Sequence, residues 1–306
     1  MLALQRFYDQ SYTLLLSERT REKLERFFIS FAIIGFATHL LLITLVETGI
    51  LPIEKAQSTL LGNYIAAIYT PFSFILIYEV YLLVYYLPKS ITVYIGKQYE
   101  IVSLIIIRRI FKDISHIEIQ ANWFSNKYDL QLTADIIGIL LLYVLIFVFY
   151  RLGRKQKRVS GVEPDQYLEK FIQAKRFTSF LLVPILVIMA VYSFATWLAE
   201  LVGLGNQNLP TITDVNEVFY RDFFTLLILV DVLLLLISFR HTEQYNKLIR
   251  NSGFIISTVL IKVSFSTEGL LNTLMIVAAV AFGVLILWIH NMYERENAVV
   301  GSTTSP

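Results

Sequence analysis

The chain has 306 residues, of which 56% are apolar and only 16% are charged, and its mean hydropathy is +0.62. A water-soluble domain of this length carries far more charge, so the composition indicates an integral membrane protein. The net charge of +2, with basic residues spread in separate clusters, gives no footprint for nucleic-acid binding, and the lack of cysteine excludes disulfides, thiol nucleophiles and thiolate metal sites.

Six apolar segments are long enough to cross a bilayer whose hydrocarbon core is roughly 30 Å thick. They begin at about Phe27, Ile65, Leu132, Phe177, Phe223 and Leu270. Residues 1–26, which precede the first segment, carry periodic Leu, Phe and Tyr with charged side chains interspersed, and predict an amphipathic helix on the cytoplasmic membrane surface. Residues 296–306 predict a disordered tail.

Two further segments, residues 94–111 and 252–266, are ambiguous because they contain charged side chains. Cytoplasmic loops of membrane proteins carry an excess of Lys and Arg. If both segments cross, 19 of the 26 basic residues lie in the cytoplasm; if neither crosses, the division is 13 and 13. The sequence therefore predicts an all-α protein with eight transmembrane helices, both termini in the cytoplasm, and a place in a plasma or inner membrane.

The two ambiguous segments resemble each other. IVSLIIIRRIF at residues 101–111 matches IISTVLIKVSF at residues 255–265, an offset of 154. FISF at residues 28–31 matches FTSF at residues 177–180 at an offset of 149, and Glu79 aligns with Asp231 at 152. These slowly rising offsets predict two parallel four-helix repeats. Their ranges are residues 27–153 and 174–295, joined by a basic cytoplasmic linker over residues 154–173.

The charges inside the predicted spans are the candidates for chemistry. Glu79 and Asp231 each lie within an apolar second helix of their repeat. Since a carboxylate at mid-bilayer costs about 2.5–3.5 kcal/mol, both should face the protein interior and have partners. The bases of the third helices are the expected partners: Arg108 or Arg109 for Glu79, and Lys262 for Asp231.

Asp135 lies near the start of the predicted fourth helix. It could face the level of Arg108. An acidic residue so close to a helix start, however, commonly serves the N-terminal helix dipole or the membrane interface instead. Asp135 therefore joins the candidate residues for an ion path or gate, with both interpretations open.

Intramembrane acids and bases favour a protein that conducts or transports ions, with the charged residues lining or gating the path. The alternative is a non-catalytic scaffold or sensor subunit of a larger complex, in which the same acids and bases only lock the helix packing. No HExxH, GxSxG or phosphate-binding motif is present, so no enzyme, cofactor or metal is expected. The expected partners are membrane lipid and either a second copy of the chain or another membrane protein.

Overall fold

A computed structural model describes residues 12–50, 64–114, 127–157, 166–201, 215–241, 245–267 and 269–303. These residues form helices and short turns, and no strand occurs among them. The prediction of an all-α chain is thus confirmed for this part. Residues 1–11 of the surface helix predicted over residues 1–26, and residues 158–165 in the basic linker, lie outside it.

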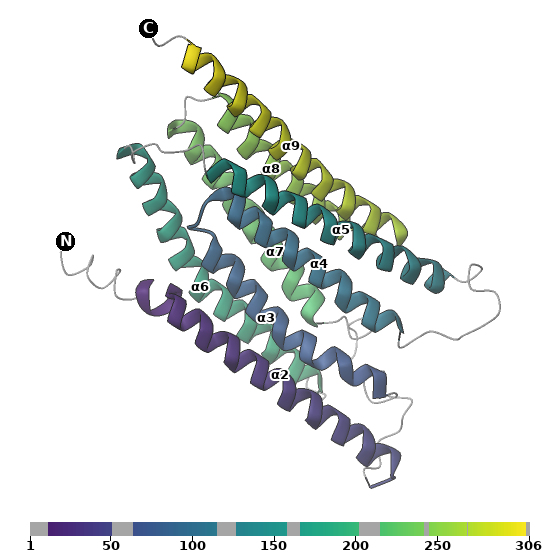
Figure 1. Cartoon of the computed structure of the whole chain (residues 1–306). Coiled ribbons are helices and arrows are strands. Elements are labelled where there is room, and N and C mark those ends of the chain that lie inside the picture. Colours follow the sequence, from purple (N-terminus) through teal and green to yellow (C-terminus); the bar gives the residue numbers. More distant parts are fainter. Residues whose placement is uncertain are drawn as a thin grey trace, which may run out of the picture. The chain divides into compact units, whose positions relative to one another are not determined.

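Eight long helices follow one another in the described ranges (Figure 1). They are α2 (Glu18–Glu47), α3 (Tyr69–Tyr86), α4 (Ile91–Ile114), α5 (Lys127–Lys157), α6 (Gln166–Leu201), α7 (Val215–His241), α8 (Tyr245–Ser264) and α9 (Leu270–Thr303), with the 3-10 helix η2 (Tyr64–Ile68) before α3. Each apolar segment and each ambiguous segment of the sequence corresponds to one of them.

Four of the helices contain stretches that are long and apolar enough to cross a membrane. These stretches are Glu18–Glu47, Asp129–Arg154, Phe171–Tyr192 and Leu270–Glu296. Helices α3 and α7 contribute the shorter apolar stretches Thr70–Tyr86 and Phe223–Phe239. Membrane-type helices are therefore present, while the total of eight crossings stays a prediction.

Two helix ends differ from the sequence expectation. Helix α2 begins at Glu18, well before the apolar segment, because the Ser17 side chain accepts a hydrogen bond of 3.2 Å from the backbone N–H of Thr20 and so caps the helix. Helix α9 continues to Thr303, where a disordered tail was expected from residue 296. The Ala and Val residues that follow the charged turn of α9 are compatible with continued helix, so the polar C-terminal residues do not end it at once.

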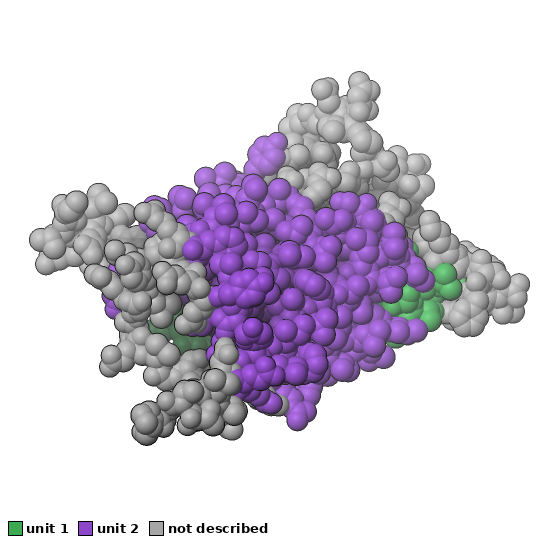
Figure 2. Space-filling model, turned by 90° about the horizontal axis from the view of Figure 1, so that it is seen from above, with its two compact units in different colours: residues 1–85, 104–136 green, residues 86–103, 137–306 purple. Residues whose placement is uncertain are grey.

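The chain divides into two compact units, which Figure 2 distinguishes by colour. Unit 1 comprises residues 1–85 and 104–136, and unit 2 comprises residues 86–103 and 137–306. Helices α4 and α5 each contribute to both units. These boundaries differ from those of the two predicted repeats, so the repeat stays a statement about the sequence.

In unit 1, α2 packs closely along α3 (Figure 1). The close approach depends on Gly35, where an added Cβ would lie 2.7 Å from the Phe74 ring. One turn further along, the His39 ring Nδ1 and the Thr70 hydroxyl are hydrogen-bonded at 2.6 Å. Aromatic packing between Phe28 and Tyr78, at 6.1 Å between ring centroids, extends the contact.

In unit 2, α8 and α9 form an antiparallel hairpin (Figure 1). The turn between them uses Gly269, whose φ of +69° is a left-handed conformation that suits glycine. Helix α7 packs against both α6 and α8. From α4, the Tyr99 hydroxyl joins the Ser257 hydroxyl at 2.7 Å, and Ser257 is also 2.7 Å from the Ala279 carbonyl of α9.

Large apolar side chains cover the outside of several helices. On α5, Leu140, Tyr143 and Phe147 are 63%, 76% and 59% exposed, and on α6, Ile188 and Tyr192 are 67% and 73% exposed. Continuous apolar surface of this kind is rare on proteins in water and marks contact with lipid or another protein. The outward faces of α5 and α6 thus agree with the membrane class that the composition indicates.

Candidate functional site

Asp231 lies halfway along the apolar stretch Phe223–Phe239 of α7. Its residue surface is only 4% exposed. The helix around it is built from Leu, Ile, Val and Phe, which favour an apolar environment on every side. The apolar side chains of α7 around Asp231 offer its carboxyl group no hydrogen bonds. Its polar partners must therefore come from neighbouring helices.

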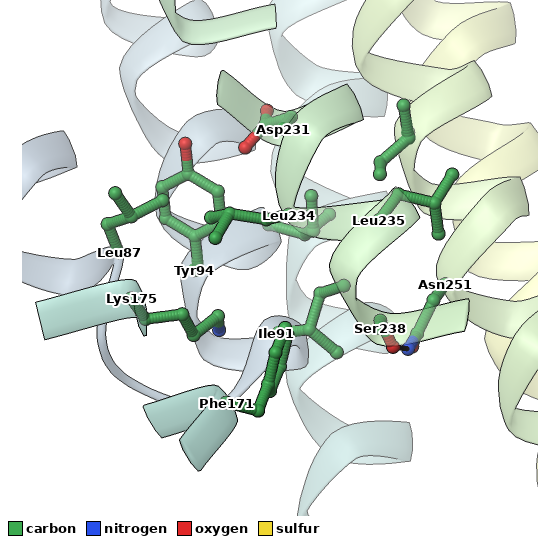
Figure 3. Close-up of a pocket in the computed structure, with 12 residues that line it drawn as sticks. Leu87, Ile91, Tyr94, Phe171, Lys175, Asp231, Leu234, Leu235, Ser238 and Asn251 are labelled. Carbon is green, nitrogen blue, oxygen red and sulfur yellow. Dashed lines mark hydrogen bonds between the residues drawn. The ribbon is translucent and has the colours of Figure 1, made fainter. Parts of the chain in front are cut away.

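Helix α4 supplies the polar groups that face Asp231. The side-chain amide of Gln98 donates a hydrogen bond of 3.1 Å to Asp231 Oδ2. Tyr94 lies four residues earlier, hence on the same face of α4. Its buried hydroxyl points toward Asp231 (Figure 3) but makes no hydrogen bond of normal geometry within the described residues. Asp231 is therefore opposed by neutral groups from α4, and its hydrogen-bonding capacity is not exhausted.

Helix α6 supplies a charge that acts on Asp231. Lys175 is only 5% exposed, and its ammonium group acts electrostatically on the Asp231 carboxyl. The ammonium donates a hydrogen bond of 2.9 Å to the backbone carbonyl of Lys89, in the turn between α3 and α4, and lies 5.4 Å from the centre of the Phe171 ring. Lys175 and Asp231 do not form a direct ion pair; their attraction acts across the space between them.

That space is a small cavity (Figure 3). About 20 Å³ of it is open to a water molecule, which is room for about one water. Asp231, Tyr94 and Lys175 reach it from three different helices, and Ser238 and Asn251 line it further along, joined by a contact of 3.5 Å. The rest of the lining is apolar: Leu87, Ile91, Ile95, Phe171, Leu234, Leu235 and Ile255.

A second, smaller space adjoins Asp231 beside Gln98. It measures about 10 Å³. Thr258 is the one further polar residue in its lining, and the others are Val102, Phe224, Leu227, Ile228 and Ile261. Asp231 therefore separates a cavity that contains a base from one that is almost wholly apolar.

The charges of unit 1 are arranged differently. Arg109 of α4 and Asp135 of α5 form a bidentate ion pair. Arg109 Nε donates a hydrogen bond of 2.6 Å to Asp135 Oδ2, and Nη2 donates another of 2.6 Å to Oδ1. The Asp135 side chain is completely buried, and that of Arg109 is 24% exposed. Both oxygens of the carboxylate are thus satisfied by a geometry that fixes one helix against the other.

Glu79 of α3 is the second buried acid of unit 1, with 5% exposure. The charge that acts on it is that of Arg108 on α4, one of the two bases, Arg108 and Arg109, that the sequence offers. Stacking of Phe72 on Phe111, with ring centroids 5.1 Å apart, brings α3 against this part of α4. The predicted partner of Glu79 is therefore near it.

The predicted partner of Asp231 is not the one the structure shows. Lys262 was expected to face Asp231, but Asp231 interacts with Gln98, Tyr94 and Lys175 instead. The physical reason is helical geometry: Thr258 and Ile261 line the space beside Asp231, and the residue after Ile261 points about 100° away around α8. Lys262 is half-buried on another part of that helix.

Sequence reasoning thus missed three residues of this site. Lys175 lies before Phe177, where the apolar segment of the sequence begins, so it was not among the charges inside the predicted spans, although the apolar stretch of α6 starts at Phe171. Gln98 and Tyr94 carry no charge and drew no attention. The feature that could have identified them is their spacing of four residues, which places both on one face of a helix. Lys97 and Glu100 lie on a different face of the same helix.

Comparison with known proteins gives no relative for this chain. No protein-family model, no curated protein and no solved structure matches it. The function must therefore be argued from the residues themselves.

Proposed function

We propose that this protein is an integral membrane protein that conducts or transports ions, and that Asp231 is the central residue of the path. In this proposal all eight long helices cross the membrane, in two parallel repeats of four, and both termini are cytoplasmic. The membrane is a plasma or inner membrane. Lipid surrounds the chain, and a second copy or another membrane protein is its partner.

Helix α8 contains none of the apolar stretches described above, yet its arrangement fits a place within the membrane. On α8, one face is buried and contains Asn251, Ser257 and Thr258, whereas Ile256 and Leu260 on the opposite face are exposed. A helix in a membrane shows this pattern when its polar side packs against protein and its apolar side meets lipid. The polar character of α8 therefore supports an interior position within the bilayer.

One observation carries the proposal: the Asp231 carboxyl lies at the centre of an apolar helix and borders a water-sized cavity. A carboxylate at mid-bilayer costs about 2.5–3.5 kcal/mol, and such residues mark ion and proton pathways by default. A purely structural acid would be expected to have its charge neutralised by a direct base, as Asp135 has. Asp231 instead has a neutral amide donor and a lysine across the cavity.

The alternative is a membrane subunit that does not conduct, a scaffold or sensor in which buried charges lock the helices together. The Arg109–Asp135 pair favours this alternative for unit 1, because its two hydrogen bonds of 2.6 Å leave neither carboxyl oxygen free for an ion. In our proposal, Arg109 and Asp135 accordingly stabilise the packing of α4 against α5 and do not line the path. Glu79, Arg108 and Lys262 stay candidates for lining or gating the path.

Ion flux into liposomes tests the proposal. The purified chain is reconstituted, and the fluxes of H⁺, Na⁺, K⁺ and Cl⁻ are measured for the natural sequence and for Asp231→Asn and Glu79→Gln. The proposal expects a flux that Asp231→Asn removes. A correctly folded protein that passes none of these ions would support the scaffold alternative instead.

A further inference from the structure

We infer that the ion is the proton, and that Lys175 and Asp231 carry it together through unit 2. The inference rests on the proposed function, because it names the transported species and the groups that move it. It follows from three features of the cavity: its size, the groups that face it and the balance of charge between them.

The size of the cavity excludes a dehydrated metal ion with a full set of ligands. The space holds about one water, at about 20 Å³. Calcium and magnesium need six or more oxygen ligands, whereas Asp231 is the single carboxylate in this lining. No group of three or more His, Asp or Glu side chains suited to a metal occurs in the described residues. The ammonium of Lys175 in the same lining also repels a cation. A proton needs no such cage.

The groups that face Asp231 are few and can be named helix by helix. Helix α4 presents Tyr94 and Gln98, and α6 presents Lys175. Helix α8 presents Thr258 beside Asp231 and Asn251 further along the cavity, and neither of these titrates. Asp231 and Lys175 are therefore the acid and base of this site, and the Tyr94 hydroxyl points toward Asp231 (Figure 3).

The transfer step keeps the net charge of the cavity constant. Lys175 starts as an ammonium and Asp231 as a carboxylate. One N–H bond of Lys175 breaks, the proton passes through the intervening water, and one O–H bond forms on Asp231. The products are a neutral amine and a neutral carboxylic acid. Because both charges disappear together, the apolar surroundings favour rather than oppose this state.

Two further steps complete the movement of one proton. The Lys175 amine takes up a proton from water on the side of the cavity formed by the start of α6. Asp231 then releases its proton on the side of Gln98 and Thr258, through the smaller space of about 10 Å³. One proton enters and one leaves, and the transmembrane proton gradient sets the direction. The long Lys175 side chain can exchange its bond to the Lys89 carbonyl for water in the cavity.

The test uses the full chain in liposomes that contain a pH-sensitive dye, with a membrane potential imposed by potassium and valinomycin. We expect proton flux that does not depend on sodium or chloride. Asp231→Asn and Lys175→Met should each lower it by about 100-fold or more, which is the range for loss of a positioned proton-transfer group. Asp231→Glu should retain part of the flux. Glu100→Gln, the same carboxyl-to-amide change on α4 away from the cavity, should leave it unchanged.

Infrared spectroscopy of the same vesicles provides a readout that does not require flux. Lowering the pH should produce the C=O band of a protonated carboxyl that is absent in Asp231→Asn and present in Glu100→Gln. Proton flux that survives Asp231→Asn, or the absence of this band, would overturn the inference. A sodium or potassium flux that needs Asp231 would overturn the inference while leaving the proposed function in place. A folded protein with no flux of any ion would overturn both.

Discussion

Two buried acids, Asp135 of unit 1 and Asp231 of unit 2, meet opposite surroundings. In unit 1, Asp135 receives two hydrogen bonds of 2.6 Å from a single guanidinium, which satisfies both oxygens and fixes α4 against α5. In unit 2, Asp231 receives a hydrogen bond of 3.1 Å from a neutral amide, and the base that acts on it, Lys175, lines the same cavity without a direct ion pair. Equal burial therefore does not mean an equal role: an acid whose partner is fixed holds helices, and an acid with unused capacity can exchange a proton.

The sequence alignment of Glu79 with Asp231 suggested equal roles for these two acids. Their surroundings differ as well, because Glu79 is under the influence of Arg108 within unit 1, while Asp231 has Lys175 and two uncharged neighbours. A shared ancestral position would conserve the place of an acid along its helix. It would not conserve the residues that other helices bring to it.

The largest expected effect is the loss of stability on replacing Asp135, the acid that fixes α4 against α5. Asp135→Asn should lower the free energy of unfolding by about 3 kcal/mol, at the lower end of the range for breaking a buried ion pair, because the Arg109 side chain stays 24% exposed. Equilibrium unfolding in detergent measures this. The double variant Arg109→Met with Asp135→Leu, which removes both charges, should recover most of the loss. A loss below about 1 kcal/mol for Asp135→Asn would show that the ion pair does not stabilise the packing of α4 against α5.

The matched change in unit 2 should act on transport instead. Asp231→Asn keeps an oxygen that can accept from Gln98, so the free energy of unfolding should change by less than about 1 kcal/mol. Proton flux should fall by about 100-fold or more. Unfolding and flux are measured on the same preparation. If Asp231→Asn destabilises the protein as strongly as Asp135→Asn, the contrast between the two acids disappears.

A third change tests whether close packing of Tyr99 against Gly283 stabilises unit 2, as the buried ion pair stabilises unit 1. An added Cβ at Gly283 of α9 would lie 1.8 Å from the Tyr99 hydroxyl oxygen. Gly283→Ala should therefore cost about 1–3 kcal/mol, as overpacking of a well-filled core does. Adding Tyr99→Phe removes the oxygen and should recover part of the loss, while Ser257 keeps its bond to the Ala279 carbonyl. Equal unfolding midpoints for Gly283→Ala and the natural sequence would refute the close contact.

The smallest effect is expected where a charge pair is half-exposed. Lys97 and Glu100 lie three residues apart on α4, 2.5 Å between Nζ and Oε2, with side chains 27% and 34% exposed. Glu100→Gln should change the free energy of unfolding by about 0.5 kcal/mol or less, the usual value for such pairs. Thermal unfolding in detergent is the measurement. A loss comparable to that of Asp135→Asn would show that Glu100 stabilises the fold as strongly as Asp135 does.

The sequence predicts the helices of this protein well and the partners of its acids poorly. Long apolar segments identify α2, α5, α6 and α9 because their length and composition suffice. Helices α4 and α8 are also found, because the distribution of Lys and Arg favours two further helices at the ambiguous segments. The placement of charges along neighbouring helices narrows the base that acts on Glu79 to Arg108 or Arg109, and the structure shows Arg108. The partners of Asp231 do not, because they depend on how α4 and α6 are rotated, and rotation is set by contacts between residues far apart in the chain.

The Tyr99 hydroxyl reaches Ser257 only because position 283 has no side chain. Any side chain at position 283 would occupy the place of this hydroxyl. The absence of a Cβ at this one point of α9 therefore lets α4, α8 and α9 meet through a single pair of hydroxyl groups. A rearrangement within unit 2 that slides α4 along α9 would have to break this contact.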